Sequence, residues 1–238
     1  MADRSLFDDL ERLLRGRGAA LVACADLRPL PENVRNGLPV GVCVGVALDP
    51  RIVAEIANGP TTAYAAEYDR ANTLLQHLAD DGAAFLQSRG FHAVALRSTL
   101  AKLDPANLAT PLPHKTVGTL CGIGWIGKCA LLVNDMYGTA VRYITVLTDA
   151  PLPLGTPVES SHCGTCTACV DACPAGAASG RAWEPGLKRE EFFNAGACYE
   201  EAVRQGTKAG GRIICGICIA ACPHTKRYLA REPATTCP

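Results

Sequence analysis

The sequence has no excess of charge of either sign, because 23 Lys and Arg residues balance 23 Asp and Glu residues. Proteins that grip a phosphate backbone by themselves carry a net basic surface, so this balance argues against a nucleic-acid partner. The sequence also lacks any apolar run of the ~20 residues that a membrane-spanning helix needs. Its polar start, MADRSLFDDLER, is not that of a signal peptide. These absences predict a cytoplasmic protein without a membrane partner.

Cysteine, in contrast, is abundant, with 13 residues among 238. In a reducing cytoplasm, thiols are kept for metal or redox chemistry. Most of the cysteines form two runs, Cys163-x2-Cys166-x2-Cys169-x3-Cys173-Pro174 and the shorter Cys215-x2-Cys218-x3-Cys222-Pro223. This spacing is typical of [4Fe–4S] clusters, for which one tight loop supplies three thiolates and a distant residue supplies the fourth. The runs therefore predict a protein that transfers electrons.

The shorter run indicates how the ligands divide between two clusters. In two-cluster ferredoxins, the fourth cysteine of each run ligates the other cluster. The first cluster would then be held by Cys163, Cys166, Cys169 and Cys222. The second would take Cys173, Cys215 and Cys218, and one thiolate is missing because Arg212 stands where a full run begins. Cys198, alone in the intervening segment, can supply it, so we predict two [4Fe–4S] clusters with eight cysteine ligands.

Cysteines at such spacings have two other common uses, in zinc sites and in disulfides. Structural zinc sites also use paired CxxC units, but they need neither a third cysteine at the same spacing nor a proline after the fourth. A disulfide scaffold suits small secreted domains better than a chain of this length. Iron–sulfur ligation accounts for more of the pattern than either alternative.

The periodicity of apolar residues predicts a mixture of helices and strands. Helices are expected at 5–17, with a cap from Ser5 and Asp8, at 62–88 and at 188–203. Strands are expected at 19–25, 40–48, 91–96, 129–134 and 140–147, and residues 135–138 are expected to join the last two. Residues 206–211 are expected to form a flexible loop. The proline-containing segment 149–161 indicates a boundary. We expect an α+β protein, with an α/β sandwich at 1–155 and a two-cluster ferredoxin-like module at 156–238.

A glycine-rich segment, Gly122-Ile123-Gly124-Trp125-Ile126-Gly127-Lys128-Cys129, matches two nucleotide-binding patterns at once. Both patterns need a strand before the glycines and a helix after them, so that the helix N-terminus can receive a phosphate. Here the preceding segment contains prolines, and the following CALLVN is strand-like. We therefore reject both patterns. The segment is either a tight turn before a strand or a loop that approaches a flat cofactor, with Trp125 as a wall.

The same segment, continued through LLVNDMYGTAVRYITVLTDAPLP and CGTCTACVDACPAGA, resembles the epoxyqueuosine reductases. The resemblance covers residues 110–228, including the position of Cys198. It implies a cobalamin-binding N-terminal domain that is similar to flavin-dependent nitroreductases and to the corrinoid domain of reductive dehalogenases. A flavin is the second choice for the cofactor of this domain. By this resemblance, Gly122, Gly124, Trp125, Gly127 and Lys128 would line the cofactor pocket.

The chain departs from the family where the family has its catalytic aspartate, because Leu108 occupies that position and Asp104 is out of register. His114 and Lys115 follow instead, and they could donate protons or hold an anionic group if they border the pocket. The alternative is that both lie in an exposed loop. The sequence also ends before the helical-repeat tail of the family, which together with the charge balance leads us to expect a substrate other than tRNA.

Two functions from different classes follow. The first is an oxidoreductase whose clusters take electrons from a low-potential donor of the ferredoxin or flavodoxin type and pass them to a corrinoid, a flavin or a small-molecule substrate. The second is a cofactor-free electron-transfer module that docks a partner enzyme.

Overall fold

The computed structural model describes residues 2–97 and 108–231. The chain forms two compact units, which interleave along the sequence. We call residues 1–47, 69–125 and 142–159 the sheet unit, and residues 48–68, 126–141 and 160–238 the cysteine unit. The last crossing, between residues 159 and 160, lies close to the boundary expected at residue 155. The cysteine unit also takes in two segments of the N-terminal stretch, and the functional division at residue 155 stays a prediction.

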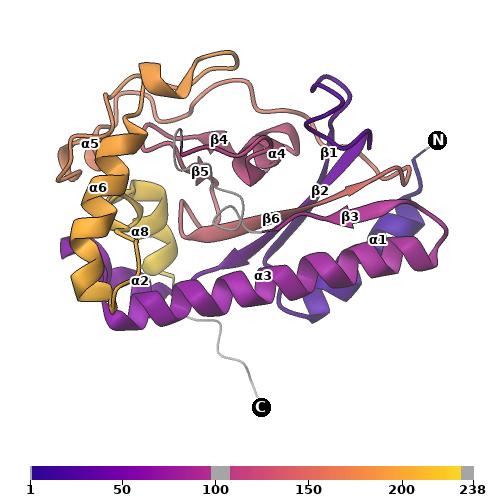
Figure 1. Ribbon diagram of the computed structural model, residues 1–238, viewed down its shortest axis with the longest axis horizontal. Helices are drawn as coiled ribbons and strands as arrows, with labels where there is room; N and C mark the ends of the chain where they lie inside the picture. Colours follow the sequence, from indigo (N-terminus) through magenta and orange to yellow (C-terminus); the bar gives the residue numbers. More distant parts are fainter. Residues whose placement is uncertain (1, 98–107, 232–238) are drawn as a thin grey trace. The chain divides into compact units, whose positions relative to one another are not determined.

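The sheet unit is built on four strands in the order β1-β2-β6-β3 (Figure 1). Their bounds are Leu21–Asp26 for β1, Val40–Ala47 for β2, Val141–Thr148 for β6 and Ala93–Ala95 for β3. β1 pairs antiparallel with β2, and β3 pairs antiparallel with β6. All of β2 except its last residue is buried, which explains why it reads as a continuous apolar run. The strand predictions for 19–25, 40–48, 91–96 and 140–147 are confirmed within a few residues.

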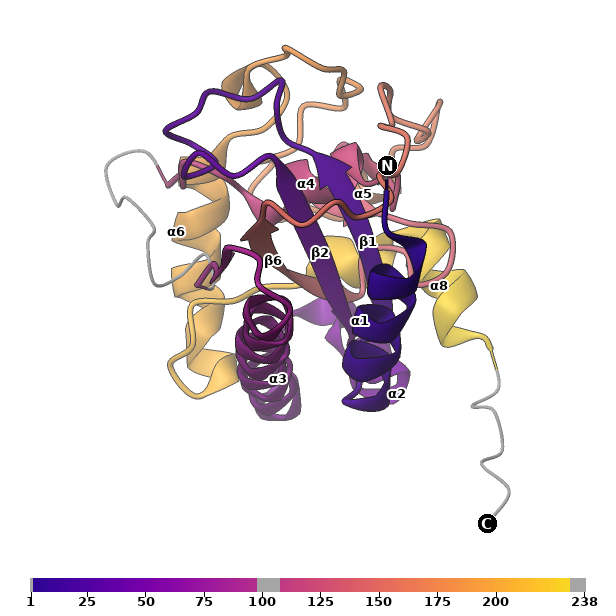
Figure 2. The ribbon, with the colours of Figure 1, turned by 90° about the vertical axis from the view of Figure 1, so that its right-hand side faces the viewer.

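Helices cover both faces of this sheet (Figure 2). On one face lie α1, Arg4–Gly16, and the part of α3 from Asp69 onward, α3 as a whole spanning Thr62–Ser88. A Cβ added to Gly82 of α3 would lie 3.6 Å from Leu14 of α1 and 3.7 Å from Val146 of β6. An added Cβ would make ordinary van der Waals contacts at these distances, so α3 packs against α1 and β6 here without a strict need for glycine.

The opposite face carries α4, His114–Leu120. Val117 of α4 belongs to a buried cluster with Cys43 of β2 and Leu147 of β6. Since successive residues of a strand point to opposite faces, Val146 packs against the layer of α1 and α3, and Leu147 packs against α4. The sheet unit is therefore mixed α/β, with a helical layer on each side of the sheet.

The cap of the first helix differs from the expectation. Asp3 is the N-cap of α1, and its carboxylate accepts a hydrogen bond from the backbone N–H of Leu6 at 2.9 Å. The predicted cap from Ser5 and Asp8 is wrong because the N-cap lies two residues earlier, at Asp3, which has the extended backbone that an N-cap needs.

The cysteine unit consists of short helices and loops. Its elements are α2 (Pro50–Ala54), η1 (Glu55–Asn58), β5 (Leu132–Val133), α5 (Ala168–Asp171), η3 (Arg189–Glu191), α6 (Ala195–Gln205), η4 (Gly206–Ala209), α7 (Ile217–Ala221) and α8 (Pro223–Leu229). α7 packs against α5, η1 and α8. Gly216 enters α7 with a positive φ of 88°, and a Cβ there would lie 2.8 Å from Ile56 and 3.0 Å from Tyr64. The turn before α7 therefore fits against η1 and the first turn of α3 only as glycine.

Three local predictions in this region are corrected. The helix expected at 188–203 is interrupted, because η3 ends at Glu191 and α6 begins at Ala195 behind an Asn194 cap. The loop expected at 206–211 contains the helical turn η4. The strand expected at 129–134 is confined to β5, which pairs with β4 (Trp125–Ile126) in a separate two-stranded sheet rather than with β6.

None of the helices in residues 2–97 and 108–231 is both long enough and apolar enough to cross a membrane.

Candidate iron–sulfur site

The four cysteines assigned to the first cluster line one cavity of the cysteine unit, with a volume of about 100 Å³. Three of them come from one short stretch of chain, with Cys163 and Cys166 in the loop that leads into α5 and Cys169 in α5 itself. That loop turns tightly, since the backbone N–H of Cys166 donates to the carbonyl of Cys163 at 3.0 Å and Gly164 has a positive φ of 52°. The fourth, Cys222, lies more than fifty residues later in the sequence. Residues that sequence spacing alone assigned to one cluster thus meet at one cavity.

Cys222 stands between α7 and α8 with an extended backbone, φ −62° and ψ 126°. Pro223 starts α8, because proline is tolerated in the first turn of a helix, where its N–H would have no partner. Burial raises the pKa of the Cys222 thiol, while hydrogen bonds from the backbone N–H groups of Thr225 and His224 lower it. Donors that point at a sulfur in this way suit a thiolate ligand.

The second predicted set, Cys173, Cys198, Cys215 and Cys218, is half-buried. The backbone N–H of Ala177 donates to the sulfur of Cys173 at 3.4 Å. Burial raises the pKa of Cys215, and Cys173 is close enough to raise it further. Cys198 lies in the first turn of α6, and its assignment as the eighth ligand stays a prediction.

No three His, Cys, Asp or Glu side chains within the described ranges converge closely enough to hold a single metal ion. This finding concerns mononuclear sites. A four-iron cluster occupies more space than one ion, so its four thiolates converge less closely.

A tight turn of the cysteine unit borders the cavity of the first set. The backbone N–H of Ala130 donates to the carbonyl of Gly127 at 2.8 Å, and Ala130 itself has a positive φ of 59°. Lys128 and Cys129 are the central residues of this turn, and both line the cavity. The end of the glycine-rich segment thus presents two functional side chains to the cysteine loop.

Lys128 is only 5% exposed, and its ammonium group donates to the carbonyls of Gly164 at 2.9 Å and Cys166 at 3.0 Å. Both acceptors belong to the loop of the first cysteine run. Lys128 is therefore not a solvent-exposed lysine. The role that the family resemblance implies for Lys128, in a cofactor pocket, stays a prediction.

Cys129 is the residue that the sequence interpretation missed. Its thiol is buried and hydrogen-bonds with Cys169 and with Cys218, one cysteine from each predicted cluster. The hydrogen bond with Cys129 is the largest cause of a raised pKa of Cys169, followed by burial. The sequence offered one signal, the position of Cys129 directly after Lys128. Cys121 stands on the other side of the same glycines, but its thiol lies in the core of the sheet unit, 3.4 Å from the carbonyl of Ala23.

The glycines of the segment are explained in part by packing. A Cβ on Gly122, whose φ is +76°, would lie 2.6 Å from the carbonyl oxygen of Thr156, and one on Gly127 would lie 2.7 Å from Val133. Helix α4 precedes the glycines, the two-residue strand β4 lies between Gly124 and Gly127, and the next element after the glycines is strand β5. This order is the reverse of what nucleotide-binding motifs need, so the rejection of both is confirmed. Gly124 and Trp125 keep their predicted role only as a proposal.

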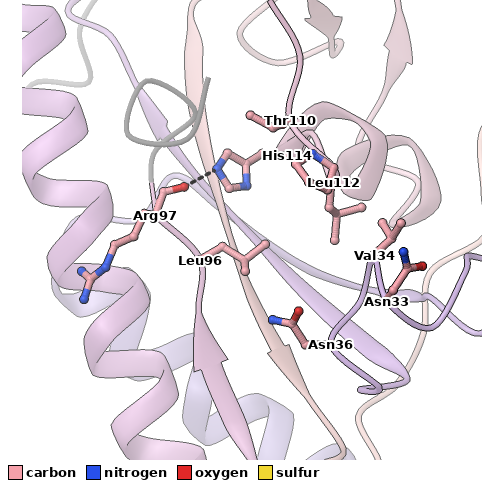
Figure 3. Close-up of a pocket in the computed structure, with 9 residues that line it drawn as sticks. Asn33, Val34, Asn36, Leu96, Arg97, Thr110, Leu112 and His114 are labelled. Carbon is pink, nitrogen blue, oxygen red and sulfur yellow. Dashed lines mark hydrogen bonds between the residues drawn. The ribbon is translucent and has the colours of Figure 1, made fainter. Parts of the chain in front are cut away.

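His114 begins α4 in the sheet unit and is 8% exposed, so the alternative of an exposed loop is wrong for it. Figure 3 shows its ring directed toward the carbonyl of Arg97. Nε2 lies 3.2 Å from that carbonyl oxygen, and Nδ1 lies 3.0 Å from the hydroxyl of Thr145. Burial lowers the pKa of His114 to about 4. The imidazole is therefore neutral at pH 7 and has a hydrogen-bond partner at each nitrogen. Lys115 is half-buried beside it in α4.

A small cavity adjoins His114 (Figure 3), with a volume of about 130 Å³. Its lining includes Asn33, Asn36, Leu96, Arg97 and Leu112. Pockets for drug-sized ligands usually measure about 300–1,000 Å³. A corrin ring therefore does not fit this cavity. Asp104, the carboxylate nearest to the family's catalytic position, lies outside the described residues.

Comparison with known proteins agrees with the cysteine pattern. Residues 162–225 match the family model of a 4Fe-4S double cluster binding domain. An epoxyqueuosine reductase from Pseudomonas aeruginosa is 38% identical over 69 residues, which cover 29% of this chain and 19% of that protein. One from Bacillus anthracis is 32% identical over 117 residues, which cover 48% of this chain and 30% of that protein. The matched segments thus span less than a third of these curated relatives.

Solved structures extend the likeness to the fold of nearly the whole chain. An epoxyqueuosine reductase crystallised with an epoxyqueuosine-modified tRNA stem loop matches with a TM-score of 0.63 at 20% identity, covering 93% of this chain and 66% of that one. A catabolic reductive dehalogenase matches with a TM-score of 0.68 at 16% identity, covering 91% and 31%. The expectation of a mixed α/β fold with a double-cluster domain is confirmed.

Proposed function

We propose, on the premise that this chain is an epoxyqueuosine reductase-like double-cluster protein, that it is an iron–sulfur oxidoreductase with two [4Fe–4S] clusters. The observation that carries the proposal is the cavity at which Cys163, Cys166, Cys169 and Cys222 meet. Four thiols from two distant segments are the donor set that such a cluster needs. Cys173, Cys198, Cys215 and Cys218 are proposed to hold the second cluster.

The chemistry that bound clusters supply is electron transfer at a potential set by their surroundings. The chain contributes ligation, burial and hydrogen bonding. The tight loop at 163–169 fixes three thiols in sequence, and the start of α8 fixes the fourth with two backbone N–H donors. The half-buried positions of most of the cysteines leave a route for an external low-potential donor, proposed to be of the ferredoxin or flavodoxin type.

The acceptor is the finer part of the proposal. A corrinoid is suggested by fold, since a reductive dehalogenase described as B12-dependent matches with a TM-score of 0.56 at 17% identity. The resemblance to the epoxyqueuosine reductases implies a nitroreductase-like sandwich for residues 1–155. The chain's own residues give the corrinoid little support, because the cavity beside His114 is too small and packing accounts for Gly122 and Gly127. We derive no step through a corrinoid.

The second candidate, a cofactor-free relay that docks a partner enzyme, is favoured by this small cavity. It is also favoured by the neutral, fully hydrogen-bonded state of His114, which leaves that residue poorly suited as a proton donor near pH 7.

The substrate proposal also differs from the relatives. A related reductase was crystallised with a tRNA stem loop. Leu108 at the position of the family's catalytic aspartate, and the balance of 23 basic and 23 acidic residues, favour a substrate other than tRNA for this chain.

Anaerobically purified protein titrated with hydroxocobalamin and, separately, with FMN tests the acceptor. Saturable uptake of either cofactor, with quenching of Trp fluorescence, would support the enzyme. Iron at about eight atoms per chain with no uptake of either cofactor would support the relay and overturn the corrinoid.

A further inference from the structure

Lys128 is a buried cation whose only described partners are two carbonyls of the first cysteine loop. Lysine is seldom buried without a compensating partner, because removing the ammonium group from water is costly. Here two N–H···O hydrogen bonds, of 2.9 and 3.0 Å, offset part of that cost. No carboxylate among the described residues forms a salt bridge with it within 4 Å. The ammonium group of Lys128 therefore has no ion-pair partner among the described residues.

The two acceptors lie at defined places in the loop. Gly164 directly follows Cys163, and the other acceptor is the carbonyl of Cys166 itself. Both carbonyls point inward to one ammonium group, so the loop between the first two predicted ligands is held in a single curvature. Gly164 supports that curvature with its positive φ of 52°.

The position of Lys128 is fixed from its own side as well. It stands in the turn closed by the hydrogen bond from Ala130 to Gly127, and a second bond of 2.9 Å runs from the N–H of Gly127 to the carbonyl of Leu131. A Cβ on Gly127 would lie 2.7 Å from Val133, so the turn packs closely against β5. A rigid turn that directs a buried cation at a ligand loop has the geometry of a built support.

The charge acts on the ligands themselves. Lys128 lines the same cavity as the four thiols. A cluster held by four thiolates is anionic and becomes more so on reduction, so a nearby buried cation stabilises the reduced form.

We propose that Lys128 is a positioning residue for the first cluster, which shapes the 163–169 loop through two carbonyls and raises the reduction potential of that cluster alone. This inference rests on the proposed function. It is distinct from a role of the glycine-rich segment in a cofactor pocket, because both contacts of the ammonium group lie within the cysteine unit.

The test compares Lys128→Met, which keeps the length of the side chain without its charge or donors, with Lys128→Arg and with Lys188→Met. Lys188 is an exposed lysine of the same unit. Each anaerobic protein is titrated by EPR-monitored reduction and analysed for iron. We expect Lys128→Met to shift one of the two cluster potentials to more negative values, or to lose one cluster selectively. The cluster potentials and iron content of Lys128→Arg should be closer to those of the parent protein, and those of Lys188→Met should equal them.

Unchanged potentials of both clusters and unchanged iron in Lys128→Met would overturn the inference, as would equal shifts of both clusters. If Lys128→Met fails to fold, Lys128→Gln is read by the same criteria. Failure of the proposed function would be distinguishable, because the parent protein itself would then contain no iron and show no reducible signal.

Discussion

The sheet unit and the cysteine unit are each stabilised by a different kind of interaction. In the sheet unit, side chains such as Leu10, Leu78 and Ile144 are fully buried between regular elements. In the cysteine unit, most helices are about one or two turns long, and thiols gather where a hydrophobic core would otherwise be. The comparison teaches that the first unit can fold on apolar packing, whereas the second is expected to depend on its clusters, since cluster ligation contributes folding energy directly.

The largest expected effect is the loss of a ligand. Cys222→Ser should remove the first cluster and lower iron from about eight to about four atoms per chain. The matched control is Cys43→Ala, which removes a fully buried thiol from the core of the sheet unit. The control should retain all its iron. Iron analysis of both proteins checks this, and equal iron loss in the two would mean that the units are not energetically distinct.

A substitution that creates a cavity in the core of the sheet unit should lower stability without lowering the iron content. Leu78 is fully buried in α3, so Leu78→Ala should lower the free energy of unfolding by about 2–5 kcal/mol. The folded variant should nevertheless keep the parent's iron content. Urea unfolding followed by circular dichroism, with cluster absorbance recorded in parallel, measures both quantities. Loss of iron before unfolding would contradict the account.

The pH dependence of stability should report on His114 in the sheet unit. Burial lowers the pKa of His114 to about 4, from about 6.5 in the unfolded chain. Between these values the unfolded state binds the extra proton, so the contribution of His114 is present above pH 6.5 and is lost as the pH falls toward 4. The loss amounts to about 3 kcal/mol at most.

Parallel measurements on His114→Gln sharpen this prediction. The variant should be less stable near pH 7, because the hydrogen bonds to Thr145 and Arg97 change. Its stability should depend less on pH between 4 and 6.5. A variant curve parallel to that of the parent across this window would show that other groups cause the dependence.

A smaller effect should distinguish two glycines of the cysteine unit. Gly138 and Gly176 both have a positive φ, of 60° and 57°. A Cβ on Gly138 would collide with the backbone N–H of Thr225, whereas none of the neighbours of Gly176 lies within 4 Å of an added Cβ. Gly138→Ala should therefore displace the start of α8 and weaken retention of the first cluster during dialysis against a chelator.

Gly176→Ala carries the backbone cost alone, of about 1 kcal/mol. It should retain iron as the parent does. Equal retention in the two variants would show that the packing of Thr225 against the 134–138 turn does not support Cys222.

The sequence predicted much of the sheet unit because periodicity reports burial. The helix at 62–88 is confirmed at both ends, since its apolar stripe runs along the whole helix. The interrupted helix before α6 and the pairing of β5 with β4 could not be read in the same way. Such short elements are decided by tertiary contacts rather than by a repeating pattern.

The candidate site shows the same division. The spacing of the cysteines assigned Cys222 to the cluster of the first run, and Cys222 lines the same cavity as that run. This was possible because cluster ligation follows a spacing rule that is visible in the sequence. The contacts of Lys128 and Cys129 depend on a turn that packs against a loop about 35 residues later, and no spacing rule encodes that contact. The buried state of His114 was missed because α4 follows a proline-containing segment that gave no helical signal.

The most direct test of the central claim is iron and acid-labile sulfide analysis of oxygen-free protein, with EPR of its dithionite-reduced form. The account predicts about eight iron and eight sulfide per chain and the signals of reduced [4Fe–4S] clusters. Colourless protein with zinc in place of iron, or protein with no metal, would contradict it.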